Sequence, residues 1–227
     1  MGDLIDNQDA KRERLTHTAG TALSERSYNL VIGGVLLWGI VINIIMAKGL
    51  RDPILCIPPV AVIVIYIIGS IVSSIVIFKS NNPAVSFAGF TVLAICMGLI
   101  LTYFITAYDI GTVTLAFEMT AIVTVAMMIL GTLFPQFFLS IGGALGIALL
   151  AGIFVEVVFG LILHKNMQIM DYVFVLIFSG FIGFDWAKAQ AYPKTLDNAI
   201  DSAADIYVDV VNIFIRLLEI FGDSNND

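Results

Sequence analysis

Seven long apolar stretches run through the chain, and short polar or helix-breaking segments separate them. An α-helix rises about 1.5 Å per residue, so roughly 20 apolar residues cross the hydrocarbon of a bilayer. Most of the stretches reach that length, and the pattern therefore predicts seven transmembrane helices. We place them at Ser27–Ala47, Ile54–Phe78, Pro83–Tyr108, Gly111–Leu133, Gln136–Leu163, Asp171–Gln190 and Asp197–Gly222.

The segments between these stretches are short, which predicts that neighbouring helices run antiparallel in one bundle. We divide the chain into a polar N-terminal tail (1–26), a seven-helix membrane domain (27–222) and a short C-terminal tail (223–227). The polar start does not have the pattern of a cleavable signal peptide, so the first apolar stretch is expected to direct insertion. Within the second stretch, Pro58 and Pro59 predict a later helix start or a kink.

Composition indicates the class of protein. The 227 residues are 59% hydrophobic and 13% charged, whereas a soluble domain is about half apolar and about a quarter charged. We therefore expect an all-α integral membrane protein with the lipid bilayer as its surroundings. The formal net charge is −7, which argues against nucleic acid as a partner, because such binding needs clustered Lys and Arg. Cys56 and Cys96 fall in apolar stretches and are expected to be small buried hydrophobes, without a disulfide or a metal.

The distribution of Lys and Arg predicts the orientation, because cytoplasmic loops carry an excess of positive charge. With the N-terminus inside, the basic residues on the inner side are Lys11, Arg12, Arg14, Arg26, Lys79, Lys188 and Lys194. Those on or toward the outer side are Lys48, Arg51, Lys165 and Arg216. We therefore expect a multi-pass protein of the cell membrane with a cytoplasmic N-terminus and an outer C-terminus.

The last two stretches carry carboxylates within apolar sequence. Asp185 ends one apolar run, and Asp197, Asp201, Asp205 and Asp209 recur every four residues, which places them along one stripe of a helix. An ionised carboxylate in hydrocarbon costs at least a few kcal/mol, so it should face the bundle interior, water or a partner. Two such groups at similar depth disfavour each other's ionisation, and the pair can share one proton. Helix geometry alone leaves open whether Asp205 or Asp209 would pair with Asp185.

The same segments carry a family resemblance. FIGFDWAKAQ and AADIYVDVVNIFIRLLEIFG resemble the last two helices of the Bax inhibitor-1 family, in which an Asp-bearing helix precedes a terminal helix of the form YLDFINLFLxLLRxxG. The matching positions are Tyr207, Asp209, Asn212, Phe214, Leu217, Leu218 and Gly222. The resemblance implies a seven-transmembrane-helix bundle with the last, Asp-bearing helix near its centre. It also implies that Asp185 pairs with Asp209 as a pH-sensitive gate over a calcium-permeable pore, and the doubly ionised pair would be a site for Ca²⁺.

Other charged residues of the apolar stretches are secondary candidates. Asp201 and Asp205 belong to the same stripe. Lys79 ends the second stretch on the predicted inner side, where it would latch the aspartate pair; the alternative role is a plain interfacial anchor. Glu118 and Glu156 fall in the outer half, where they would help to form an acidic vestibule that concentrates cations. Separate polar contacts across neighbouring helices are the alternative for these two glutamates.

The pattern and the resemblance together lead to a hypothesis of function. We expect a passive, proton-regulated leak for Ca²⁺ that needs no cofactor. An enzyme is not expected, because hydrolase and zinc-protease motifs are absent, and GFDW and YVDV differ from the motifs of intramembrane aspartyl proteases. The alternative is a non-transporting regulator that binds another membrane protein, such as a membrane protease, and would not need Asp185 or Asp209. Proton-coupled solute transport is a third hypothesis.

Overall fold

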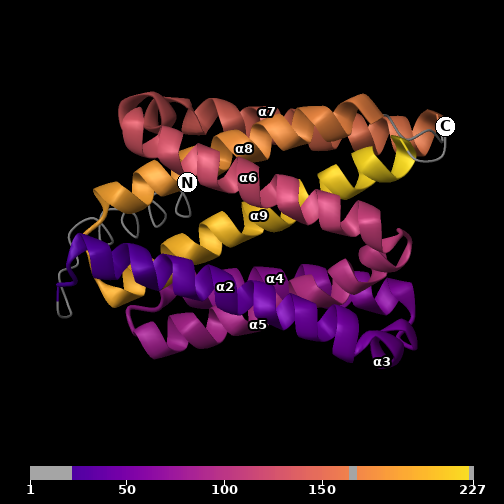
Figure 1. Ribbon diagram of the computed structural model, residues 1–227, viewed down its shortest axis with the longest axis horizontal. Coiled ribbons are helices and arrows are strands. Elements are labelled where there is room, and N and C mark those ends of the chain that lie inside the picture. Colours follow the sequence, from indigo (N-terminus) through magenta and orange to yellow (C-terminus); the bar gives the residue numbers. More distant parts are fainter. Residues whose placement is uncertain (1–21, 164–167, 225–227) are drawn as a thin grey trace, which may run out of the picture. The chain divides into compact units, whose positions relative to one another are not determined.

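The computed structural model describes residues 22–163 and 168–224, and every regular element over those residues is a helix (Figure 1). These residues contain α2 (Glu25–Gly49), α3 (Arg51–Leu55), α4 (Pro59–Lys79), α5 (Pro83–Thr106), α6 (Ile110–Leu133), α7 (Pro135–Leu163), α8 (Gln168–Ala191) and α9 (Leu196–Ser224). The prediction of an all-α protein is therefore confirmed. The predicted tails lie mostly outside the described residues, but α2 already begins at Glu25, inside the segment that we assigned to the N-terminal tail.

Six of these helices are long and apolar enough to cross a membrane: α2, α4, α5, α6, α7 and α8. The chain is therefore a multi-pass membrane protein. The seventh predicted span exists as the helix α9. Because α9 carries repeated charged side chains, it is less apolar than the other six helices and is not among those apolar enough to cross. A seventh crossing by α9 stays a prediction.

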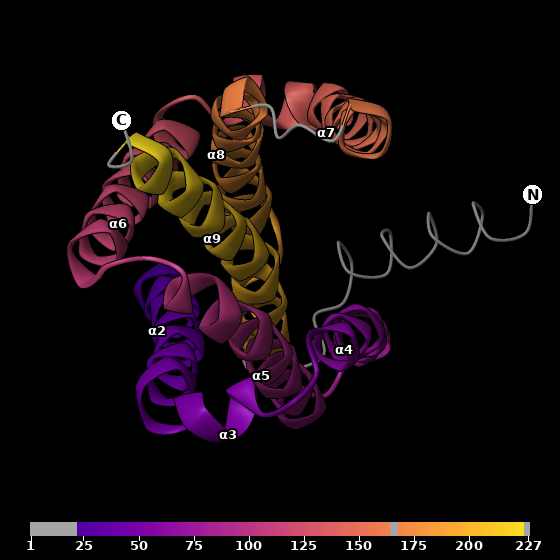
Figure 2. The same cartoon turned by 90° about the vertical axis from the view of Figure 1, so that its right-hand side faces the viewer.

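The second apolar stretch does not form one helix from Ile54, because prolines interrupt it. The chain forms the short α3, and α4 then begins with Pro59 in its first turn and Pro58 as the preceding cap. Proline suits a helix start because its missing N–H would have no partner there. Figure 2 shows α3 turning the chain between α2 and α4. The predicted later start of this helix is confirmed.

The start of α6 is set by a side-chain cap. Asp109 precedes the helix, and its Oδ1 accepts hydrogen bonds from the backbone N–H groups of Gly111 (2.8 Å) and Thr112 (3.1 Å). The Thr112 hydroxyl donates to the second carboxylate oxygen. These hydrogen bonds hold the pKa of Asp109 below its ordinary value, and the bond from the Thr112 hydroxyl contributes most to this lowering. Such a cap satisfies N–H groups that the helix itself leaves without acceptors.

The described chain separates into two compact units. Unit 1 contains residues up to Tyr103 together with Ala189–Asp205, and unit 2 contains Phe104–Lys188 and the residues from Ile206 onward. The first part of α9 therefore belongs to unit 1 and the rest of the helix to unit 2.

In unit 1, the beginning of α9 is bonded to α2 and α5. The Tyr28 hydroxyl on α2 lies 3.4 Å from the backbone oxygen of Asn198 and 3.3 Å from the hydroxyl of Ser202. The Ser86 hydroxyl on α5 donates to the Asp197 carboxylate at 2.7 Å. Burial makes such bonds structurally important, because an unpaired buried polar group is costly.

In unit 2, α8 packs closely against α6 and α7. A Cβ on Gly131 of α6 would lie 2.7 Å from the backbone oxygen of Gly183, so the two helices approach where neither has a side chain. Gly142 of α7 instead makes room for a side chain, the ring of Phe184, which a Cβ at that position would overlap. The Trp186 indole N–H also donates to the Thr132 hydroxyl at 2.7 Å. Small residues at such crossings permit the close van der Waals contact that holds membrane helices together.

Candidate functional site

The carboxylate stripe of α9 faces largely into the protein. Asp197, Asp201 and Asp209 are buried, and Asp205 is intermediate. The Thr195 hydroxyl accepts a hydrogen bond from the N–H of Asn198, which fixes the helix start from which this four-residue spacing runs. α9 therefore carries acidic groups, at regular intervals, along one side of the helix, and its buried apolar residues lie on the opposite side.

Asp185 lies on α8 in unit 2 and is buried, with 7% of its surface exposed. The Lys188 ammonium, one turn further along the same helix, forms an ion pair with it at 2.5 Å. That ammonium also lies 5.3 Å from the centre of the Phe184 ring. The sequence interpretation missed Lys188, although its position three residues after Asp185 was a readable signal.

Lys79 had two candidate roles in the sequence, a latch for the aspartate pair or a plain interfacial anchor, whereas Lys188 is a cation that binds Asp185 in the structure. Lys79 is the exposed last residue of α4 in unit 1. Three residues after Asp185 on one helix, Lys188 reaches the carboxylate without any change in tertiary structure. The latch role of Lys79 stays a prediction.

Asp209 shares unit 2 with Asp185 and is also buried, with 6% of its surface exposed. Asp201 and Asp205, the other candidates on the stripe, belong to unit 1. The burial of two carboxylates on α8 and α9 is what a proton-sharing pair requires. The approach of Asp185 to Asp209 itself stays a prediction.

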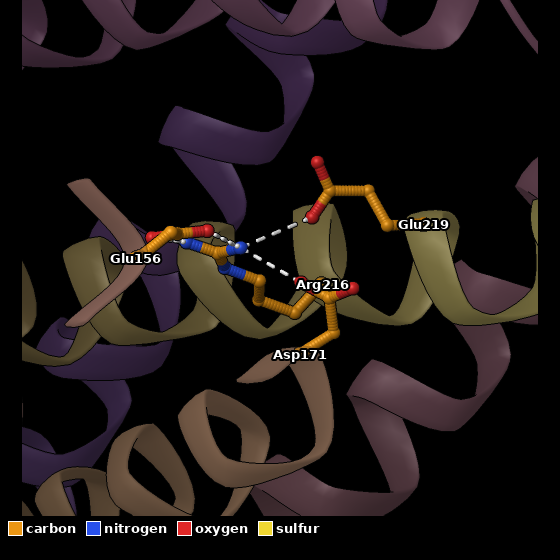
Figure 3. Close-up of polar contacts among 4 residues, drawn as sticks. All are labelled: Glu156, Asp171, Arg216 and Glu219. Atoms are coloured by element: carbon orange, nitrogen blue, oxygen red, sulfur yellow. Dashed lines mark hydrogen bonds and ion pairs between the residues drawn. The ribbon is translucent and has the colours of Figure 1, made fainter. Parts of the chain in front are cut away.

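A second group of charges surrounds Arg216 on α9 (Figure 3). Its guanidinium binds Glu156 of α7 through two parallel hydrogen bonds, of 2.7 and 2.9 Å. It also donates to Asp171 of α8 at 2.7 Å and lies 3.4 Å from Glu219 on its own helix. We call these four residues the Arg216 cluster. The sequence interpretation missed it, because nothing local relates Arg216 to Glu156 or Asp171.

The Arg216 cluster ties three helices of unit 2 together. A planar guanidinium matches a carboxylate through two N–H groups at once, which lysine cannot do. The same guanidinium lies 4.3 Å from the centre of the Phe174 ring, which adds a cation–π contact to one of its faces. One cation and three carboxylates leave a formal surplus of two negative charges. The geometry indicates a structural tie, with acids that are held in place.

Glu156 and Glu118, the two glutamates of the predicted vestibule, lie in different surroundings. Glu156 is bound to Arg216, whereas Glu118 lies on the exposed side of α6. A polar contact across helices therefore accounts for Glu156. The vestibule itself stays a prediction.

Lys194 lies in the connection that joins α8 to α9. Its ammonium donates to the backbone oxygens of Gln190 (2.8 Å) and Ala189 (3.2 Å), the last carbonyls of α8. Burial lowers the pKa of Lys194, and the nearby carboxylate of Glu25 opposes that effect. A cation at this end of a helix is favoured, because the unsatisfied carbonyls carry partial negative charge.

Metal and cysteine chemistry find little support in the described residues. Within 22–163 and 168–224, no group of three or more His, Cys, Asp or Glu side chains is arranged to hold a metal ion. Ca²⁺ binding at Asp185 and Asp209 therefore stays a prediction. Both cysteines are free; Cys96 is buried as expected, but Cys56 is exposed, because it follows the short α3 at its end.

Comparison with known proteins places these features in context. Residues 21–226 match the family described as "Inhibitor of apoptosis-promoting Bax1". Two similar proteins, from Streptococcus pyogenes serotypes M3 and M6, each carry the name "uncharacterized membrane protein". Each is 30% identical to this chain over 172 residues, which is 70% of this chain and 74% of the relative. The family match, over residues 21–226, includes both α8 and α9, on which the buried aspartates lie.

Proposed function

Because the chain belongs to the Bax inhibitor-1 family, we propose that it is a pH-sensitive passive leak for cations, with Ca²⁺ as the permeant ion. Asp185 and Asp209 form its gate in this proposal. The observation that supports it is the burial of both carboxylates, on α8 and α9 of the same unit, in a multi-pass membrane protein. Buried ionisable groups of membrane proteins commonly mark ion and proton pathways, since they are costly to keep otherwise.

The proposed gate works through the charge of the aspartate pair. When the two carboxylates share a proton, the pair carries one negative charge and titrates as a unit. When both ionise, two adjacent carboxylates attract a divalent cation, and Ca²⁺ favours oxygen ligands of this kind. Flux then depends on pH because protons and cations compete for the same oxygens.

Lys188 adds a third competitor in this proposal. Its ammonium already occupies an oxygen of Asp185. A permeant cation must displace it or bind beside it, so the ion pair limits the leak when no cation is present. Lysine suits this role because its single point charge sits on a flexible chain and leaves a carboxylate more readily than an arginine fork does.

The remaining carboxylates of α9 extend the proposal toward the start of the helix. Asp201 and Asp205 would provide acidic groups along the route of a cation. With the N-terminus in the cytoplasm of a cell, the α8–α9 connection would face the cytoplasm. Protease access to tags at the two ends, in oriented vesicles, tests this orientation.

The test of the function is Ca²⁺ entry into liposomes that contain the purified full-length chain. Entry is measured with a trapped calcium indicator over a series of pH values, against protein-free liposomes. The proposal expects entry above the protein-free rate and a change of rate with pH. A rate equal to that of empty liposomes at every pH would contradict the leak. It would favour the alternative, a regulator that binds another membrane protein and does not need Asp185 or Asp209.

A further inference from the structure

Glu118 lies at the centre of the exposed face of α6. Buried residues of this helix occupy the opposite side: Thr112, Ala116, Thr120 and Gly131. Spacings of three, four, seven and eleven residues align Glu118 with large apolar side chains that are exposed to the surroundings: Leu115, Ile122, Val125 and Ile129. We call these five residues the outward face of α6. Glu118 is its only charged member.

This position is unfavourable for a carboxylate in a bilayer. Glu118 lies eight residues after Ile110, about 12 Å along a span that is about 36 Å long. The hydrocarbon is about 30 Å thick, so Glu118 is attached to the helix at a point well inside the hydrocarbon. Among the residues that the structure describes, none forms a hydrogen bond or an ion pair with Glu118. Charged residues inside a span usually find a partner of opposite charge, because burying them alone costs several kcal/mol.

A second copy of the chain does not supply that partner. The exposed basic residues of the described chain all stand at or beside helix ends: Arg26, Lys48, Arg51 and Lys79. The other three are occupied within the chain, Lys188 by Asp185, Lys194 by backbone carbonyls and Arg216 by three carboxylates. Over the part of the chain that the structure describes, no basic group is therefore presented at the depth of Glu118 on the surface of another copy.

We infer that the outward face of α6 binds a transmembrane helix of a different membrane protein, one that carries a lysine or arginine at the depth of Glu118. The apolar members of the face supply van der Waals contact along about four turns. The ion pair sets the register and selects the partner, because a helix without a basic residue leaves the carboxylate unpaired. This interaction is independent of Asp185 and Asp209 and therefore goes beyond the proposed leak.

The test uses full-length protein in liposomes and a synthetic polyleucine helix as the probe. One version of the peptide carries a single lysine about 12 Å from the matching membrane surface, and the control version carries glutamine there. Energy transfer between labelled protein and labelled peptide measures association. Interhelical polar pairs in membranes contribute about 0.6–2 kcal/mol, so the lysine peptide should bind about 3- to 30-fold more tightly than the glutamine peptide.

Three variants make the result specific. Glu118→Gln keeps the shape and should abolish the preference for the lysine peptide. Glu118→Lys should reverse it, so that a peptide with glutamate at that position binds better than the lysine peptide. Leu115→Ala changes the apolar part of the face and should leave the lysine-to-glutamine ratio unchanged.

Two outcomes would overturn the inference. Equal binding of lysine and glutamine peptides to the wild-type chain would mean that Glu118 selects no cationic partner and simply faces lipid. Energy transfer between two differently labelled copies of the chain that is lost in Glu118→Gln would assign the face to a second copy instead.

Discussion

The two groups of carboxylates in unit 2 are held in different ways. In the Arg216 cluster, three acids converge on one guanidinium, which reaches Glu156 on α7 and Asp171 on α8 from its place on α9. Asp185 instead pairs with Lys188, a neighbour on its own helix. The first arrangement exists only when three helices are in place, whereas the second exists on α8 alone. Carboxylates fixed by an arginine fork are suited to structure, and a carboxylate held by a local lysine can exchange its partner.

The largest effect is expected from breaking the Arg216 cluster. Arg216→Met removes the cation and leaves three carboxylates facing one another. Removing one partner of a buried ion pair costs about 3–5 kcal/mol; partial exposure of Glu156 reduces this to about 2–3 kcal/mol. Thermal unfolding in detergent or lipid should therefore show a clearly lower Tm.

Two matched variants sharpen that prediction. Arg216→Lys keeps the charge but loses the two parallel hydrogen bonds, so its Tm should lie between those of the wild type and Arg216→Met. Adding Glu156→Gln to Arg216→Met should recover part of the lost stability, because it removes one of the repelling charges. An unchanged Tm in Arg216→Met would contradict a structural role for the cluster.

The next effect concerns the pH response of the proposed leak. Asp209→Asn removes one charge and keeps the shape, so the pair no longer shares a proton. Ca²⁺ flux into liposomes should lose most of its dependence on pH, whichever way its level moves. Asp185→Asn should do the same, and the double variant should add little, because the two residues act as a unit.

The control for this prediction is Asp205→Asn, on the same helix one turn earlier. It should leave the pH dependence intact. If Asp205→Asn abolishes it while Asp209→Asn does not, the pair is Asp185 and Asp205. If none of the three variants changes the response, the leak mechanism is wrong and the regulator hypothesis gains support.

A smaller effect is expected from Lys188. Lys188→Met frees the Asp185 carboxylate for permeant cations, so Ca²⁺ flux at neutral pH should rise. A partly exposed ion pair contributes about 0.5–1 kcal/mol, which corresponds to a rise of roughly two- to fivefold. Lys79→Met is the matched control, since it removes a lysine near a helix end without touching this pair. An equal rise in both variants would indicate a general effect of surface charge.

The smallest effect on stability is expected from Asp109, which is exposed and caps the start of one helix, α6. Asp109→Ala should lower Tm by a few degrees at neutral pH, because the cap of α6 is lost. The folded-state pKa of Asp109 lies below the ordinary value of 3.8. Its contribution is therefore present above pH 3.8 and is lost as the pH falls below that value through the folded pKa. The difference in Tm between wild type and variant should shrink over that acidic range and stay constant above it.

The sequence predicted most of the helices and the aspartates that the proposal uses. The length of the apolar stretches and the helix breakers between them were sufficient to predict the six apolar spans. Pro58 and Pro59 were sufficient to predict the late start of α4. These features are local, since hydrophobic length and proline geometry act within a few turns of one segment. The burial of Asp185 and Asp209 also followed from their place in apolar sequence.

The sequence did not predict which charges meet. Arg216 lies 60 residues from Glu156 and 45 from Asp171, and it was counted only as a mark of orientation. Lys79 was considered for Asp185 on the basis of predicted topology, while Lys188, three residues after Asp185 and bound to it, was not considered.

The amino-acid sequence by itself determined that the chain is helical, where its apolar spans lie, and that α9 carries acids every four residues. Tertiary structure alone decided that Glu156 and Asp171 are neutralised by Arg216, and that Glu118 points away from the core. The physical reason is the range of the forces. Apolar length and helix period act along one segment, whereas an ion pair between helices depends on which faces pack together, and many sequences with the same pattern would pack differently.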